Sequence, residues 1–345
     1  MPPVPEAEIP DRHLGLVTAD ELSELREKID RLADAAEEGI DLHALCALAQ
    51  TAKPLTDTHM PLARATDFPV RVAVAKDRAF CFYNEDNFDV LRELGAELVP
   101  FSPLTDERLP EHIDGLYLGG GYPELYEKQL SENEIMRDSI KTAILSGLPT
   151  VAECGGFLYL LQSLDGAAMA GVLPTSAHMT HRLQPFGYVT LTANSDNLLC
   201  EAGGQFPVHE FHYAQAVDNG TDFRAVKPNG RAWDCGFASD TLYAGFPHLY
   251  FREENNRRAS GNIRHRLTEN TRKLHNRVLQ KTQSAERHGN ICKTISRRRH
   301  AFLIQRPDGR NSLFKCHFPL LSAHFRTKFA AISVFARKYK CGNPA

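Results

Sequence analysis

Several common functional signatures are absent from this 345-residue sequence. None of its eight cysteines forms a CxxC pair, so we expect neither a zinc knuckle nor another metal site. It contains no GxxxxGK[ST] and no GxGxxG, which argues against a self-contained P-loop or dinucleotide site. No apolar run reaches the roughly 18 residues of a membrane helix. The acidic, Pro-rich start, MPPVPEAEIPD, is unlike a secretory or transit signal, so we expect a cytoplasmic protein without a membrane partner.

The net charge of −3 averages two segments of opposite charge. Residues 1–251 contain 18 basic and 38 acidic residues, whereas residues 252–345 contain 22 basic and 5 acidic residues. Such a basic tail, with consecutive arginines at 297–299 and interleaved Phe, could neutralise nucleic-acid phosphates. It carries no RRM, KH or zinc-finger pattern, so we favour an unstructured or mistranslated extension over a nucleic-acid partner.

The hydrophobic pattern divides the chain into three parts: residues 1–69, with two short helical patterns, residues 70–251, where strand and helix patterns alternate, and the tail at 252–345. In the middle part we predict strands at VRVAVA, AELVPF, DGLYL and TVAE, helices over 84–94, 131–147 and 156–164, and later strands around AGVLP, FGYVTLTA and PVHEFHYA. This alternation predicts an α/β fold, with a parallel sheet covered by helices.

A capping box, Ser131 with Glu134, marks the predicted start of the helix over 131–147. Gly147, followed by Pro149, marks its end.

The segment TVAECGGFLYLL, residues 150–161, places Cys154 between a strand and a helix. This order is typical of a nucleophile elbow, in which a sharp turn presents the nucleophile and only small neighbours fit. A helix N-terminus beside the sulfur favours the thiolate. The alternative is a buried structural cysteine, which this context makes the weaker interpretation.

Two further features could serve such a nucleophile. The segment GLYLGGGYPE, residues 115–124, ends a strand in three glycines, whose backbone N–H groups could stabilise an oxyanion. The alternative is a flexible turn. His209, His212 and His248 are the candidate bases, because histidine can take a proton from a thiol near neutral pH.

Seven segments in order resemble one family, the glutamine amidotransferase half of cobyrinate a,c-diamide synthase: FCFYNEDN, ELVPFSPL, DGLYLGGGYPELY, AECGGFLYLL, AGVLP, HEFHY and GFPHLYF. The resemblance covers about residues 71–251. RHLGLV, at 12–17, and the two helices after it resemble the family's inter-domain region. The resemblance implies a class I glutamine amidotransferase-like sheet with flanking helices, a short helical remnant of an ATP-binding domain over 1–69, and the basic tail as an extension.

The resemblance also implies roles for particular residues. Cys154 would attack the side-chain amide of glutamine, and His248 would act as its base and later as the acid that protonates ammonia. Backbone amides of Gly120 and Gly155 would hold the oxyanion, with Gly121 as a further candidate.

The third residue of the usual triad would stand two positions after the histidine, where this chain has Tyr250. The family uses a Cys–His dyad, so the departure fits it. His209, Glu210 and His212 are then interpreted as structural or glutamine-pocket residues.

In the family, ATP and magnesium activate the a and c carboxylates of a corrin precursor for amidation in cobalamin biosynthesis. That chemistry belongs to an N-terminal domain of which this chain carries only the end, so we expect neither cofactor to bind here. The missing head and the unmatched tail suggest a truncated or frame-disrupted product. A catalytically impaired fragment, a hydrogenobyrinate or nickel-sirohydrochlorin a,c-diamide synthase, and a homodimer remain alternatives.

Overall fold

The computed structural model describes residues 3–12, 15–53, 70–252, 302–305 and 311–314. The chain divides into two compact units, Met1–Arg272 and Lys273–Ala345. Each unit is considered by itself.

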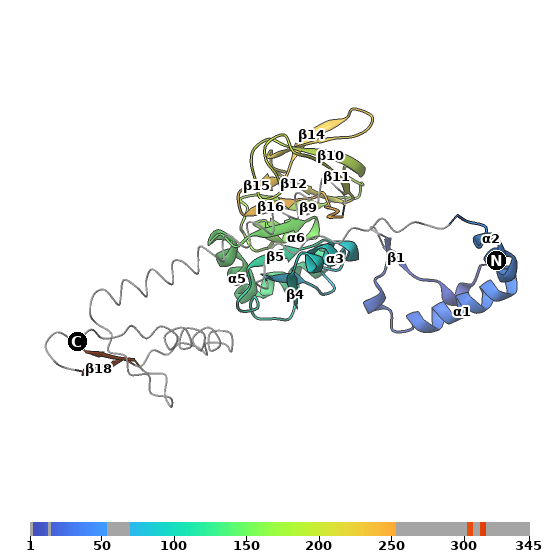
Figure 1. Ribbon diagram of the computed structural model, residues 1–345, viewed down its shortest axis with the longest axis horizontal. Helices are drawn as coiled ribbons and strands as arrows, with labels where there is room; N and C mark the ends of the chain where they lie inside the picture. The colour runs from blue at the N-terminus through green and yellow to red at the C-terminus, as the bar shows by residue number, and fades with distance from the viewer. Residues whose placement is uncertain (1–2, 13–14, 54–69, 253–301, 306–310, 315–345) are drawn as a thin grey trace, which may run out of the picture. The chain divides into compact units, whose positions relative to one another are not determined.

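A six-stranded sheet forms the centre of the first unit (Figure 1). Its strand order is β15-β16-β6-β5-β3-β4, and every neighbouring pair is parallel except the edge pair β15–β16. The strands are β3 (Val70–Ala75), β4 (Ala96–Phe101), β5 (Gly115–Leu118), β6 (Thr150–Glu153), β15 (Phe237–Ala238) and β16 (Leu242–Gly245). The four predicted strands of the α/β core are confirmed.

Helices cover both faces of this sheet, as the alternating pattern predicts. They are α3 (Glu85–Glu93), α4 (Glu127–Glu132), α5 (Glu134–Leu145) and α6 (Gly155–Leu160), with the 3-10 turn η3 (Pro123–Tyr126) before α4. On one face Leu118 packs in a buried cluster with Phe157 of α6. On the other, Val72 and Tyr117 share a cluster with Phe88 of α3. Because the parallel strands end at one edge, the loops after β5, β6 and β16 meet there.

Two smaller sheets follow in the sequence. One has the order β11-β10-β13-β14, and the other the order β12-β9-β7-β8. Their strands are β7 (Ser163–Leu164), β8 (Ala167–Ala168), β9 (Ser176–Met179), β10 (Gly187–Ala193), β11 (Gln205–Glu210), β12 (Ala214–Ala216), β13 (Phe223–Val226) and β14 (Ala232–Cys235). The strands predicted at FGYVTLTA and PVHEFHYA are confirmed, whereas AGVLP is not a strand and precedes β9.

The N-terminal segment carries both short helices that its pattern predicts, α1 (Leu25–Gly39) and α2 (Leu42–Ala49). Before them lie η1 (Pro5–Ala7), β1 (Asp11–Arg12), β2 (Gly15–Leu16) and η2 (Ala19–Glu21). Arg12 pairs with Glu21 at 3.0 Å and lies 4.9 Å above the ring of Tyr122. This segment therefore contacts the chain directly after the three glycines.

Of the predicted basic extension, the structure describes Arg252 and one hairpin. Arg252 pairs with Glu93 of α3 at 3.2 Å, so it packs with the α/β core rather than with a separate tail. The hairpin joins β17 (Phe302–Gln305) and β18 (Asn311–Phe314) in antiparallel register. The rest of the predicted extension lies outside the described residues. Among the described helices, none has the length and apolarity to cross a membrane.

Two helix boundaries differ from the sequence prediction. Ser131 does not cap the helix over 131–147, because it lies inside α4. The cap of α5 is Asn133, whose side chain accepts from the Met136 N–H at 3.4 Å and donates to the carbonyls of Pro103 and Asp106 at 2.9 Å each. Helix α6 ends at Leu160 rather than at 164, because residues 163–164 pair with β8 and β9.

The two candidate caps can be compared directly. Asn133→Ala removes three hydrogen bonds and is expected to lower the free energy of unfolding by about 1–3 kcal/mol in urea titrations. Ser131→Ala, two positions away, is the matched control and should change it by less than about 0.5 kcal/mol. Equal effects of the two substitutions would contradict this assignment of the cap.

Candidate active site

Cys154 stands at the turn between β6 and α6, with φ 49° and ψ −100°. A non-glycine residue at positive φ costs about 1–3 kcal/mol, so the surrounding contacts must hold it there. Its N–H donates to the carbonyl of Gly245 at 2.8 Å, and its carbonyl accepts from the Leu158 N–H at 3.0 Å. A Cβ on Gly156 would lie 2.2 Å from the Leu118 carbonyl oxygen, which explains the small residue there. This is the geometry of a nucleophile elbow.

The loop after β5 lies against this turn. A Cβ on Gly155 would come within 3.0 Å of the Gly121 nitrogen, and one on Gly120 within 2.7 Å of His248 Cε1. The Gly120 carbonyl is held by the N–H groups of Cys81 and Phe82, at 3.0 Å each. Within the described part of the chain, we find no hydrogen bond donated by the N–H groups of Gly120, Gly121 or Gly155. The three glycines named from the sequence thus surround the elbow.

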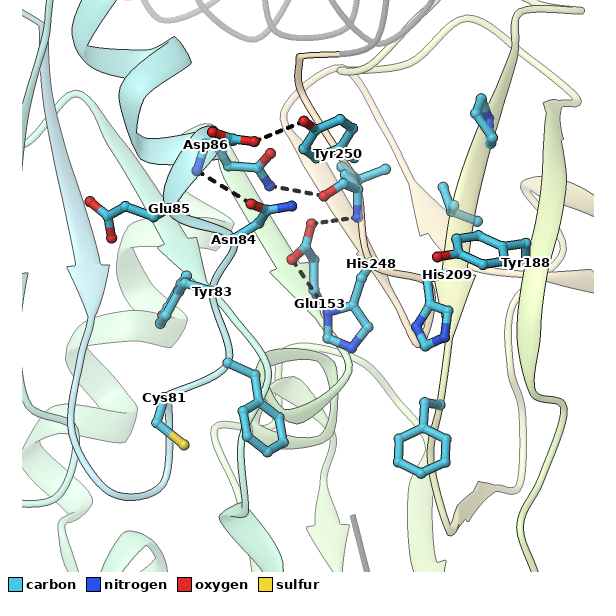
Figure 2. A pocket seen from close by; sticks show the side chains of 16 residues that line it. Cys81, Tyr83, Asn84, Glu85, Asp86, Glu153, Tyr188, His209, His248 and Tyr250 are labelled. Atoms are coloured by element: carbon cyan, nitrogen blue, oxygen red, sulfur yellow. Dashed lines mark hydrogen bonds and ion pairs between the residues drawn. The ribbon is translucent and has the colours of Figure 1, made fainter. Parts of the chain in front are cut away.

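His248 follows β16 and completes the group. Its backbone pairs with that of His209 through N–H to carbonyl contacts of 2.8 and 3.3 Å. Its ring lies beside Glu153, with Nδ1 3.7 Å from Oε2 (Figure 2). Burial lowers the pKa of His248, but the interactions with Cys154 and Glu153 outweigh burial and raise this pKa to about 10. This shift favours the protonated ring at neutral pH.

Glu153 is a site residue that the sequence interpretation missed. Its side chain is 2% exposed. Oε1 accepts from the Leu249 N–H at 3.0 Å, and Oε2 accepts from the Tyr117 hydroxyl at 3.0 Å. The available signal was the sequence TVAE itself, because a carboxylate at the end of a buried strand needs partners.

Asn87 fastens the segment that carries His248 to α3. Its side chain donates to the Leu249 carbonyl at 2.8 Å and accepts from the Phe251 N–H at 2.8 Å. Tyr250, in the position of the usual third triad residue, instead donates its hydroxyl to Asp86 at 2.8 Å (Figure 2).

His212, another candidate base, has partners of its own. Its Nε2 lies 3.1 Å from Glu210 Oε1, its Nδ1 lies 2.7 Å from the Ala214 carbonyl, and its ring stacks on Phe246 at 3.6 Å. His212 thus pairs with Oε1 of Glu210 inside the protein. Burial, and then the charge of His248, lower the pKa of His209.

A pocket of about 930 Å³ opens beside this group (Figure 2). Its walls include Asp86 on one side and Tyr188 and His209 on the other, and both Glu153 and His248 reach it. Cys154 is not among the lining residues. The pocket thus reaches the ring of His248 and the Glu153 carboxylate.

The parallel sheet, the flanking helices and the turn after β6 define a class I glutamine amidotransferase fold. More specifically, the chain belongs to the family of CobB/CobQ-like glutamine amidotransferase domains, whose model matches residues 71–256. The matched range extends past the predicted boundary at 251 and includes Arg252, in agreement with the packing of that residue on α3.

Curated relatives are similar over a longer stretch. A cobyrinate a,c-diamide synthase of Caldanaerobacter subterraneus subsp. tengcongensis is 40% identical over 252 residues, 71% of this chain and 55% of the relative. One of Methanothermobacter thermautotrophicus is 40% identical over 250 residues, 71% and 56% respectively. The chain thus spans about half the length of the curated relatives it matches. The structure of PurLQS from Thermotoga maritima is similar to 57% of this chain at 17% identity, with a TM-score of 0.45.

The raised pKa of His248 predicts a pH dependence of stability. Because the folded-state pKa of about 10 exceeds the ordinary 6.5, protonated His248 stabilises the fold fully below pH 6.5 and loses this effect as the pH rises through about 10. Urea unfolding should therefore show the difference between wild type and His248→Asn shrinking from pH 6 to pH 10. His178→Asn, at an exposed position of β9, is the control. A His248 difference that stays constant over this range would contradict the prediction.

Proposed function

We propose that this chain is the glutaminase part of a cobyrinate a,c-diamide synthase, in which Cys154 and His248 release ammonia from glutamine. The observation that carries the proposal is Cys154 at the sharp turn after β6, beside a glycine loop whose Gly120 lies against the ring of His248. A charged imidazolium beside a thiol at a sharp turn is an arrangement that activates a sulfur nucleophile.

In the first half-reaction, the Cys154 thiolate attacks the side-chain amide carbon of glutamine. The carbonyl oxygen becomes an oxyanion, which the N–H groups of Gly155 and of Gly120 or Gly121 would stabilise. His248 gives its proton to the amide nitrogen. The carbon–nitrogen bond breaks, ammonia leaves, and a thioester remains on Cys154.

In the second half-reaction, the now neutral His248 takes a proton from water, which attacks the thioester carbon. A second oxyanion forms in the same place and collapses, and glutamate leaves. The departing thiolate and the reprotonated imidazole restore the starting pair.

Since the relatives are cobyrinate a,c-diamide synthases, we propose corrin carboxylates as the acceptor of the ammonia. Hydrogenobyrinate and nickel sirohydrochlorin remain alternative acceptors. Within the described residues no group of three or more His, Cys, Asp or Glu side chains could hold a metal ion.

Replacement of the nucleophile tests the proposal. Cys154→Ala should lower glutaminase activity by at least about a thousandfold, both for the chain alone and with a separately supplied ATP-binding domain. A glutamine-shaped electrophile should add its mass to Cys154 in the wild type. Cys46→Ala, which alters an exposed thiol on α2, is the control and should leave both results unchanged. Absence of any adduct at Cys154 would refute the proposal.

A substitution in the glycine loop tests the packing of Gly120 against His248. Gly120→Ala places a methyl group 2.7 Å from His248 Cε1, so it should displace the ring and lower kcat by about tenfold or more. The conflict is with a side chain, so the protein should still fold. In Gly156→Ala the methyl group meets the Leu118 carbonyl oxygen at 2.2 Å, and thermal unfolding should show a clear loss of stability. A fully active Gly120→Ala would contradict the close approach of Gly120 to the catalytic ring.

A further inference from the structure

The proposed reaction leaves one buried carboxylate at the site without a role. Glu153 is the residue directly before the nucleophile, and only 2% of it is exposed. A charged carboxylate held away from water is costly unless opposite charge and hydrogen-bond donors surround it. Its position at the centre of the site therefore calls for an explanation.

The two oxygens of Glu153 make different contacts on the same segment. Oε1 accepts from the Leu249 N–H at 3.0 Å, which fixes the backbone directly after His248. Oε2 faces His248 Nδ1 at 3.7 Å (Figure 2). It also accepts from the Tyr117 hydroxyl at 3.0 Å. A distance of 3.7 Å is an ion-pair contact, and such contacts are often longer before substrate binds.

We propose that Glu153 is the positioning residue of His248, which it holds by the backbone of the following residue and by the Nδ1 edge of the ring. The inference rests on the proposed glutaminase function. The carboxylate that other class I amidotransferases place two residues after the histidine is replaced here by one that is adjacent to the nucleophile in sequence. Nδ1 then points to Glu153, which leaves Nε2 for the sulfur.

The electrostatics agree with this arrangement. Glu153 is one of the two groups whose hydrogen bonds raise the pKa of His248, the other being Cys154. The other titratable groups that face His248 or Glu153 are His209, Tyr83, Tyr117 and Tyr243. Of these, His209 repels a positive charge on His248. When Cys154 is replaced, the Glu153 carboxylate is therefore the negative charge that remains beside the ring.

Steady-state kinetics give the first test. Glu153→Gln keeps an acceptor for the Leu249 N–H but removes the charge. It should lower the kcat of glutamine hydrolysis about tenfold to a hundredfold with KM within about threefold. The alkaline limb of kcat should move to lower pH. Glu153→Asp keeps the charge on a shorter side chain and should fall between wild type and Glu153→Gln. Glu97→Gln removes the same charge at the exposed surface, as a control.

The second test does not depend on glutaminase activity. In a Cys154→Ala background, NMR titration of His248 reports the influence of Glu153 without the thiol. Adding Glu153→Gln should lower the His248 midpoint by about one pH unit or more, whereas adding Glu97→Gln should leave it in place. An unchanged midpoint in a folded Glu153→Gln protein would overturn the assignment. Absence of a Cys154 adduct in the wild type would instead refute the glutaminase function, and the titration would still decide the role of Glu153.

Discussion

The arrangement of the site depends on one hydrogen bond, from the Leu249 N–H to the Glu153 carboxylate. It joins the end of β6, where the candidate nucleophile begins its turn, to the segment after β16 that carries His248. The two strands are already parallel neighbours, with Glu153 opposite Gly245. The hydrogen bond continues this pairing past the last paired residues of the sheet. The same contact gives the buried Glu153 carboxylate a partner and fixes the segment that carries the imidazole next to the end of β6.

The remaining contacts make this junction rigid. Asn87 of α3 holds Leu249 and Phe251 by their backbones, and the Tyr117 hydroxyl from β5 occupies the other oxygen of Glu153. The β5 strand and the segment after β16 therefore meet at one carboxylate, while α3 holds that segment in place. Satisfied buried polar networks of this kind specify a single geometry, because any alternative would leave a polar group unpaired. Within this network, backbone hydrogen bonds to Gly245 and Leu158 hold Cys154 at its positive φ.

The fold was largely predictable because its strands and helices follow local periodicity. The segment VRVAVA, the helix over 84–94 and the cysteine between strand and helix all have clear patterns within short windows. Asn133 was missed as a cap because a capping box two residues earlier had the stronger sequence pattern. The contacts of Asn133 to Pro103 and Asp106 are tertiary, so the local sequence does not reveal them.

The candidate site was predictable in its residues but not in its connections. The resemblance to a known family named Cys154, His248 and the glycines, and the structure brings them together. The resemblance did not reveal the contact between Glu153 and His248. The two residues are 95 positions apart in the sequence, and the contact depends on the pairing of β6 with β16. The residue two positions after the histidine is Tyr250, which has no carboxylate and donates its hydroxyl to Asp86.

The central claim is that the buried Glu153 carboxylate and the Cys154 thiolate favour the protonated form of His248 at neutral pH. Nitrogen-15 NMR of histidine-labelled wild-type protein at pH 8 measures this most directly, with His248→Asn used to assign the signals. The account predicts that both ring nitrogens of His248 carry protons, while exposed histidines are neutral. A neutral His248 ring at pH 8, titrating near its ordinary pKa of 6.5, would contradict it.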